Sequence, residues 1–206
     1  MSIFQTVAVV IALAGAAIGI IGVITLIAAM QHRPYNAEKA PVRSSPVEGI
    51  LWSFTLGMAP WKKESARIHW IAYLRGIILH ISIFIGAAFL IVNPWLGELS
   101  EWLRFAAAIT LVIGALMGLA GFWIRWHDPV MRDLSTPDDY FALALTTLFM
   151  ATGVVAALLV DLAPIFWIVS GITMAYVPFG KLRHLIYFFY SRAFLGMVFG
   201  RRGVLE

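Results

Sequence analysis

The stretch Ile68–Val92, IHWIAYLRGIILHISIFIGAAFLIV, decides the fold class of this chain. Apart from two histidines, the only ionisable side chains in it are those of Tyr73 and Arg75. An apolar run longer than about 18 residues is typical of a transmembrane helix. Because the apolar residues are continuous rather than alternating, this run does not fit a strand of a β-barrel.

Four further runs have the same character, so the sequence predicts an all-α integral membrane protein with five transmembrane helices. We expect a single membrane domain over residues 1–206, with a long cytoplasmic loop at about 31–67. This loop contains four prolines, which predicts an irregular strap. Pro178 in the last helix predicts a kink or tilt. The expected helices cover about residues 3–30, 68–92, 102–123, 140–160 and 164–190.

The composition agrees with a membrane protein. Of the 206 residues, 61% are hydrophobic and 13% are charged, whereas about 25% are charged in a soluble domain. The absence of cysteine excludes a disulfide, a thioether-bound haem and an iron–sulfur cluster held by this chain. A complete enzyme is not expected from this sequence, because it has no cluster ligands, no nucleotide motif and no soluble domain.

The basic residues predict the orientation. The loop between the first two expected helices, the third loop and the tail hold nearly all of them, whereas the N-terminus and the fourth loop hold none. The positive-inside rule then places the N-terminus outside and the C-terminus in the cytoplasm. The net charge of +4 therefore reports topology, and nucleic acid is not an expected partner. The residues concerned are Arg33, Lys39, Arg43, Lys62, Lys63, Arg67, Arg125, Arg132, Lys181, Arg183, Arg192, Arg201 and Arg202.

Ionisable residues at membrane depth are candidates for function. His80 is expected roughly 15–18 Å from the cytoplasmic edge of its helix, and His184 roughly 9 Å from the end of the last helix. Two imidazoles from facing helices at compatible depth form the axial pair of a b-type haem, which needs no cysteine. A histidine that only bonds a neighbouring carbonyl is the plainer interpretation of either residue.

Several neighbours extend the haem hypothesis. Arg75, Lys181 and Arg183 are near enough in sequence to bind the haem propionates, although Arg75 could equally snorkel to the interface. His69 is the competing axial ligand. It lies eleven residues before His80 and on nearly the same helix face, so two stacked haems are conceivable. A second haem needs another histidine at outer depth, and because none exists we expect one haem b.

Two local patterns predict structure rather than chemistry. Pro137, Asp138 and Asp139 are typical of a helix start, with Ser135 or Thr136 as the cap. The weaker interpretation makes one of these aspartates a proton acceptor in quinol oxidation. Glycines in the first and third expected helices predict close helix packing. These glycines are Gly15, Gly19, Gly22, Gly114, Gly118 and Gly121.

Three passages of the sequence carry a family resemblance: Leu79–Ile83, Ser135–Gly153 and the run PFGKLRH at residues 178–184. They resemble the membrane cytochrome b (gamma) subunits of respiratory nitrate reductase and of related redox complexes in sulfur metabolism. The first passage resembles the first haem-ligand segment of that family, and the second resembles the entry into its fourth helix. The third resembles the end of its fifth helix, where the ligand histidine comes last. The resemblance covers roughly residues 66–191.

The resemblance implies a subunit that passes electrons between membrane quinone, menaquinone or ubiquinone, and cytoplasmic iron–sulfur subunits. It implies the cytoplasmic (inner) membrane of a prokaryote, and other membrane or periplasmic cytochrome subunits are possible partners. His80 and His184 match the ligands of the inner haem. Leu90 and about Phe166 stand where the family has the outer-haem histidines. The quinone-binding residues are therefore unknown.

Two other functions fit the same spans. A haem-free membrane scaffold would anchor a catalytic complex through the same helices. A small transporter is the third candidate, although it predicts more polar residues along the helix faces than this chain has.

Overall fold

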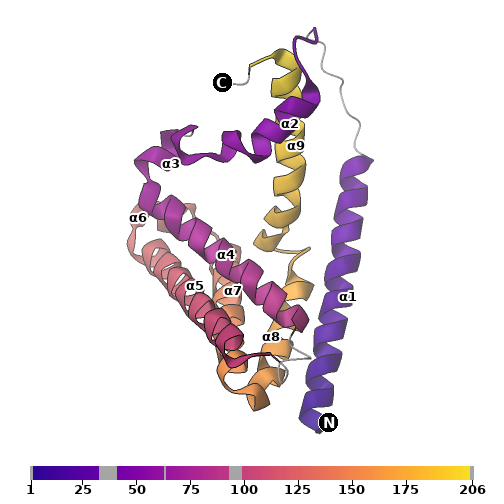
Figure 1. Cartoon of the computed structure of the whole chain (residues 1–206), viewed down its shortest axis with the longest axis vertical. Helices are drawn as coiled ribbons and strands as arrows, with labels where there is room; N and C mark the ends of the chain where they lie inside the picture. Colours follow the sequence, from indigo (N-terminus) through magenta and orange to yellow (C-terminus); the bar gives the residue numbers. More distant parts are fainter. Residues whose placement is uncertain (1, 33–40, 63, 93–98, 205–206) are drawn as a thin grey trace. The chain divides into compact units, whose positions relative to one another are not determined.

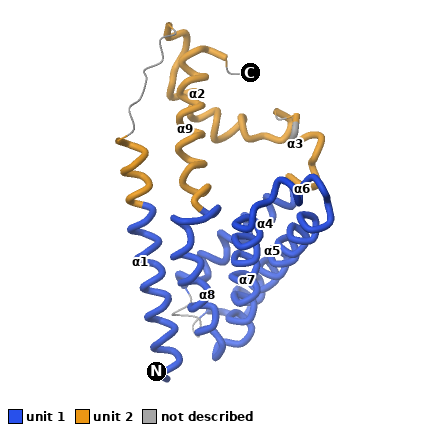
Figure 2. The backbone as a smooth tube through the Cα atoms, turned by 180° about the vertical axis from the view of Figure 1, so that it is seen from behind, with its two compact units in different colours: residues 1–23, 74–182 blue, residues 24–73, 183–206 orange. Residues whose placement is uncertain are grey.

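The computed structural model describes residues 2–32, 41–62, 64–92 and 99–204. Within these ranges the regular secondary structure is helical and no residue lies in a strand, so the all-α prediction is confirmed. The chain divides into two compact units, shown in two colours in Figure 2. The first unit comprises Met1–Val23 and Leu74–Leu182, and the second comprises Ile24–Tyr73 and Arg183–Glu206.

The first unit is built mainly from long apolar helices (Figure 1). Among the described residues, α1, α4, α5 and α7 are each long and apolar enough to cross a membrane. A fifth span results if Val160–Tyr176 and Lys181–Arg202 form one broken span. The helices that lie wholly or mostly in this unit are α1 (Ile3–Gln31), α4 (Trp70–Val92), α5 (Glu101–His127), α6 (Pro129–Leu134), α7 (Pro137–Leu158), η4 (Val160–Leu162) and α8 (Ala163–Tyr176).

Aromatic residues from three helices form the core of the first unit. The Phe166 ring of α8 lies 5.9 Å from that of Phe89 in α4 and 5.2 Å from that of Phe149 in α7. Leu111 and Met150 are fully buried in the same cluster. These contacts hold α4, α5, α7 and α8 together.

Glycines allow the helices of this unit to approach closely, as the sequence predicted. A Cβ atom added at Gly171 of α8 would lie 2.5 Å from the backbone oxygen of Ile11 in α1. One added at Gly114 of α5 would collide with Ser82 of α4. The Ser82 hydroxyl lies 3.0 Å from the carbonyl oxygen of Thr110 in α5. Small residues and hydroxyl–carbonyl bonds of this kind are typical of helix contacts in membranes.

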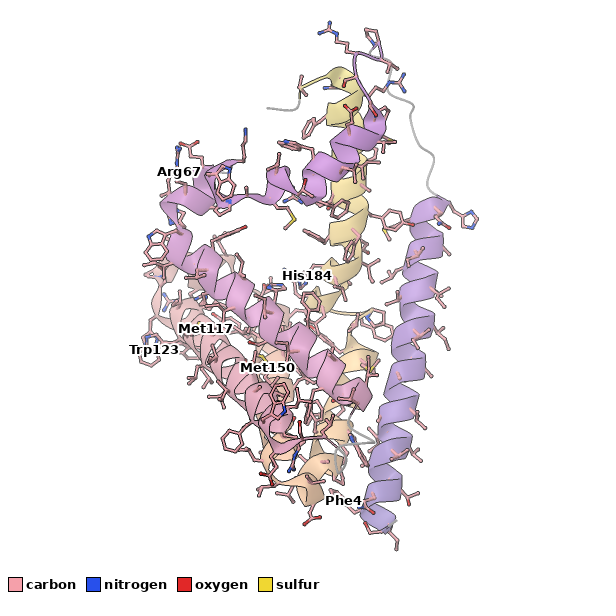
Figure 3. All side chains as sticks on the ribbon, in the orientation of Figure 1. Phe4, Arg67, Met117, Trp123, Met150 and His184 are labelled. Carbon is pink, nitrogen blue, oxygen red and sulfur yellow. The ribbon has the colours of Figure 1, made fainter. Side chains whose placement is uncertain are left out.

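The outer surface of these helices is apolar. Only 17% of the most apolar 18-residue stretch of α1 is buried. In α5, the side chains of Trp102 and Trp123 are 69% and 65% exposed. Figure 3 shows Trp123 projecting outward from α5. A water-exposed surface rarely carries contiguous apolar area on this scale, whereas lipid would cover it.

In the second unit, the segment predicted as an irregular strap contains helices. They are α2 (Pro46–Phe54), η1 (Leu56–Met58), η2 (Pro60–Lys62) and α3 (Glu64–Ile68). The Ser45 hydroxyl accepts a hydrogen bond from the Glu48 backbone amide at 3.3 Å, and Pro46 occupies the first turn. The prediction of an irregular strap was therefore wrong at α2. A capping serine followed by proline at the first helical position favours the start of a helix.

The helix α2 packs along α9 (His184–Arg202) in this unit. A Cβ atom added at Gly49 would lie 2.6 Å from the Cα atom of Gly200. The Ser53 hydroxyl donates a hydrogen bond to the Arg192 carbonyl at 2.9 Å. Arg33, Lys39 and Lys63, used above for the orientation, lie outside the described residues.

The last predicted helix is two helices, α8 and α9, rather than one over 164–190. Pro178 has no amide hydrogen and its ring clashes with the preceding helical turn. The amides of Phe179 and Gly180 donate to the Tyr176 carbonyl at 3.0 and 3.2 Å, which closes the end of α8. Then η5 (Lys181–Arg183) leads into α9. His184 is therefore the first residue of α9, and its predicted place about 9 Å before a helix end is wrong.

Candidate functional site

The ring of His80 on α4 has one defined orientation. Its Nδ1 atom lies 2.6 Å from the carbonyl oxygen of Gly76, one turn earlier. Because a carbonyl oxygen only accepts, this contact assigns the proton of a neutral imidazole to Nδ1 and the lone pair to Nε2. Metal-binding histidines are commonly oriented in this way, with one ring nitrogen bonded to a carbonyl.

The same bond occurs elsewhere in the first unit. The Nδ1 atom of His127 on α5 lies 2.9 Å from the Trp123 carbonyl oxygen. The His127 ring is also stacked on the Trp123 indole, with 3.7 Å between ring centroids. The carbonyl bond alone therefore does not distinguish a metal-binding histidine from a structural one. The two rings differ in what surrounds them.

The backbone of α4 is open at Gly76, one turn before His80, whereas the glycines described above contact other helices. Among the described residues, no atom outside its own stretch of α4 lies within 4 Å of a Cβ added at Gly76. Residues four apart lie on one helix face, so this open space adjoins the His80 side chain. A flat group bound at Nε2 could approach the α4 backbone at Gly76.

Arg75 of α4 points toward α5 rather than to the open face at Gly76 and His80. Its Nη1 atom is buried and has no hydrogen-bond partner in the described part of the chain. The Cζ atom of Arg75 is 3.9 Å from where a Cβ of Gly121 in α5 would lie. The Arg75 side chain as a whole is half-buried, so the unpaired donor is a single buried nitrogen of a partly exposed guanidinium.

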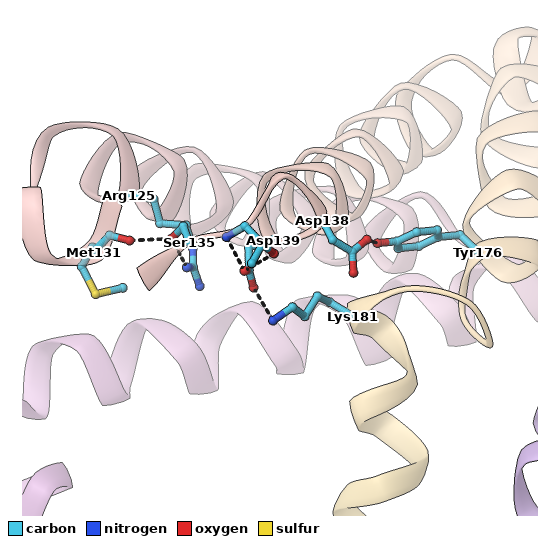
Figure 4. A network of polar contacts seen from close by, with 8 residues as sticks. Arg125, Met131, Ser135, Asp138, Asp139, Tyr176 and Lys181 are labelled. Carbon is cyan, nitrogen blue, oxygen red and sulfur yellow. Dashed lines mark hydrogen bonds and ion pairs between the residues drawn. The ribbon is translucent and has the colours of Figure 1, made fainter. Parts of the chain in front are cut away.

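Lys181 takes part in a polar network at the start of α7 (Figure 4). Its Nζ atom lies 3.3 Å from Oδ1 of Asp139. Oδ2 of Asp139 accepts hydrogen bonds from the backbone amide and the hydroxyl of Thr136, at 2.9 and 2.8 Å. The Tyr176 hydroxyl donates to Asp138. The predicted helix start is confirmed, with Thr136 rather than Ser135 as its cap residue, and both aspartates have structural partners.

The remaining predicted site residues belong to the second unit. Arg183 is the N-cap residue of α9, and its Cζ atom lies 6.0 Å from the ring centroid of Tyr187. His184 is exposed, as is His69, which lies in the turn between α3 and α4. His80 and Arg75 belong to the first unit. The pairing of His80 with His184, and the choice between His80 and His69, thus remain predictions.

Other parts of the described chain offer less. No group of three or more histidine, aspartate and glutamate side chains is placed to hold a metal ion in the described ranges. An open pocket of about 460 Å³ runs along the end of α5. Its lining is almost entirely apolar and fits the aromatic belt at a membrane interface. The lining residues are Leu119, Phe122, Trp123, Trp126 and His127.

Sequence analysis missed Gly76 and Arg125 as parts of this site. The signal for Gly76 was a glycine one turn before a histidine on the same face. Arg125 follows Gly121 by one turn in the same way, and Gly121 is the residue that faces Arg75. A glycine one turn from a histidine or an arginine is too common in helices to identify a site without the three-dimensional packing.

The fold and these side chains define an all-α protein with four or five helices apolar enough to span a membrane. No protein-family model matches the chain, and no solved structure matches it. The chain is similar to a curated protein of Nitratidesulfovibrio vulgaris, with 28% identity over 154 residues. The matched region covers 72% of this chain and 68% of that protein.

Proposed function

We propose that this chain is the b-type cytochrome subunit of a quinone-linked respiratory redox complex in the cytoplasmic membrane of a prokaryote. The observation that carries the proposal is the face of α4 at His80. There a carbonyl bond orients the imidazole, and Gly76 leaves open space one turn away. The resemblance of Leu79–Ile83 and of residues 178–184 to the gamma subunits supports the same function.

We propose one haem b for this chain, with His80 and His184 as its axial ligands and with Arg75, Lys181 and Arg183 beside its propionates. The orphaned Nη1 atom of Arg75 is the observation that favours an anionic group here, whereas Lys181 already shares its charge with Asp139. When bound, haem b supplies a one-electron carrier whose potential depends on its ligands and surroundings.

The protein's part in this function is placement and electrostatics. The Gly76 carbonyl keeps His80 in the tautomer that presents Nε2. The apolar core of Phe89, Phe149 and Phe166 fixes α4 against α7 and α8. The positive charge of Arg75 favours the reduced state of a nearby redox group, because reduction adds negative charge.

The proposed partners follow from what the chain lacks. It has no cysteine, so the iron–sulfur clusters belong to cytoplasmic subunits. The basic first loop and tail form their proposed docking surface, with the C-terminus in the cytoplasm and the N-terminus outside. Membrane quinone, menaquinone or ubiquinone, is the proposed substrate on the other side of the electron path.

A spectrum of membranes tests this function. Cells that express the chain with haem available should show the reduced-minus-oxidised Soret and α bands of a b haem, and cells without it should not. A colourless chain that still purifies with cytoplasmic subunits would instead identify a haem-free scaffold. A colourless chain without such subunits would leave the transporter as the candidate.

A further inference from the structure

The helix α9 is too polar to cross a membrane by itself and too apolar for a surface in water. It is 19 residues long, but the helices of the described ranges that are long and apolar enough to cross alone are α1, α4, α5 and α7. A helix of this intermediate character, rich in aromatic residues, is typical of the membrane interface, where it lies in the plane of the headgroups. The aromatic residues of α9 are Tyr187, Phe188, Phe189, Tyr190, Phe194 and Phe199.

The side of α9 that faces away from α2 carries an exposed aromatic stripe. The opposite side is held against α2 by glycine, since a Cβ atom added at Gly196 would lie 2.6 Å from the Gly49 carbonyl oxygen. At about 100° per residue, Phe194 lies far round the helix from Gly196, and Tyr187 and Tyr190 lie near Phe194. Phe194 is 47% exposed, and each tyrosine is 37% exposed. These three residues form the aromatic stripe, which α2 does not cover.

The charges along this helix have one sign. Between residues 183 and 202 the sequence has no acidic residue and has Arg183, Arg192, Arg201 and Arg202. Arg201 follows Phe194 by two helical turns and so lies on the same side of α9 as the aromatic stripe. At the other end, the Arg183 guanidinium carbon lies 6.0 Å from the ring centroid of Tyr187. Positive charge of this kind complements the acidic headgroups of a membrane surface, where tyrosine is also enriched.

We propose that α9 lies along the membrane surface, with the aromatic stripe among the headgroups and Arg201 at the phosphates of acidic phospholipids. Only residues 177–183 separate α9 from the apolar helix α8, which brings a lipid surface within reach of it. A soluble partner would need acidic groups arranged along the whole stripe, whereas an acidic lipid surface offers them everywhere. The outer face of α2 remains for the cytoplasmic subunits of the proposed function.

The test uses the purified full-length chain, one copy per lipid nanodisc, with single cysteines introduced into a sequence that has none. Phe194→Cys reports on the aromatic stripe. Leu51→Cys is the matched control, because Leu51 is 62% exposed and lies on the side of α2 away from Gly49. A water-soluble maleimide should label the Leu51→Cys variant quickly in phosphatidylglycerol and in phosphatidylcholine. It should label the Phe194→Cys variant slowly in phosphatidylglycerol and faster in phosphatidylcholine, which lacks the net negative charge.

Removal of one charge sharpens the test. Arg201→Gln, added to Phe194→Cys, should raise the labelling rate in phosphatidylglycerol about fivefold, as expected from the attraction of one arginine to an anionic surface. Lys62→Gln, which removes a charge from η2, should leave the rate unchanged.

Equal labelling rates for the two cysteine variants in phosphatidylglycerol would overturn the inference. A slow rate at residue 194 in both lipids would overturn it as well and would indicate a protein contact instead. If Phe194→Cys does not fold, as judged by its helical circular dichroism, Tyr190→Cys carries the same test. The labelling does not require haem, so its result is independent of whether the proposed function holds.

Discussion

Nδ1 of His80 lies 2.6 Å from the carbonyl oxygen of Gly76, and the space beside Gly76 is open. This relationship joins a fixed imidazole tautomer to room for a flat ligand on one face of α4. It is the structural basis for the haem proposal, and several of the experiments below act on it.

The histidine variants test the ligand assignment. His80→Ala and His184→Ala should each abolish the b-type spectrum, because a single axial imidazole holds a six-coordinate haem poorly. His69→Ala should leave the spectrum intact. His127→Ala is the matched control, because His127 makes the same carbonyl bond on another helix. A spectrum that survives His80→Ala and disappears with His69→Ala would reverse the assignment.

Gly76→Leu tests the open face of α4. In the described part of the chain, no atom outside its own stretch of α4 lies within 4 Å of the new Cβ, and leucine favours a helix over glycine by roughly 0.5–1 kcal/mol. Thermal stability of the haem-free chain should therefore stay level or rise, while haem content falls. Ala87→Leu, exposed on the same helix, is the control and should retain haem. Full haem content in Gly76→Leu would show that the ligand does not lie at this face.

Tyr176→Phe tests the network at the start of α7. The hydroxyl donates to the Asp138 carboxylate, and hydrogen bonds to charged groups contribute about 1.5–3 kcal/mol. We expect a lower thermal midpoint in detergent and an unchanged haem spectrum. Asp133→Asn on exposed α6 is the control, because it changes a polar side chain at the surface outside this network. A changed haem spectrum with normal stability would instead place the network at the redox site.

The orientation can be tested because the chain contains no cysteine. A single cysteine at Ser2 should react with a membrane-impermeant maleimide in intact cells, and one at Val204 should react only after the membrane is opened. This result follows from the basic residues of the first loop and tail. The opposite labelling pattern would invert the proposed topology and move the docking surface to the outside.

The helices could be predicted from sequence because lipid solvation leaves a signal in composition alone. The runs at 3–30 and 68–92 closely match α1 and α4, and the glycines of α1 and α5 were correctly predicted to lie at helix contacts. The start of α7 was also predicted, because Pro137 and the following aspartates form a local cap.

The errors have local causes. The prolines at 41–60 obscured the cap at Ser45, so α2 was missed. The kink at Pro178 was predicted and the chain is bent there, but one helix over 164–190 was expected, whereas the chain ends α8 and begins α9 at His184. Gly76 and Arg125 could not be identified because their surroundings depend on which helices pack against α4 and α5, which a sequence does not reveal.

The most direct measurement of the central claim is a pyridine haemochrome assay on the purified chain, combined with its protein concentration. The proposal predicts about one haem b per chain, since two axial imidazoles serve one iron. A value near two would contradict the single haem and require further ligands. A colourless protein, purified from cells with haem available, would contradict the function itself.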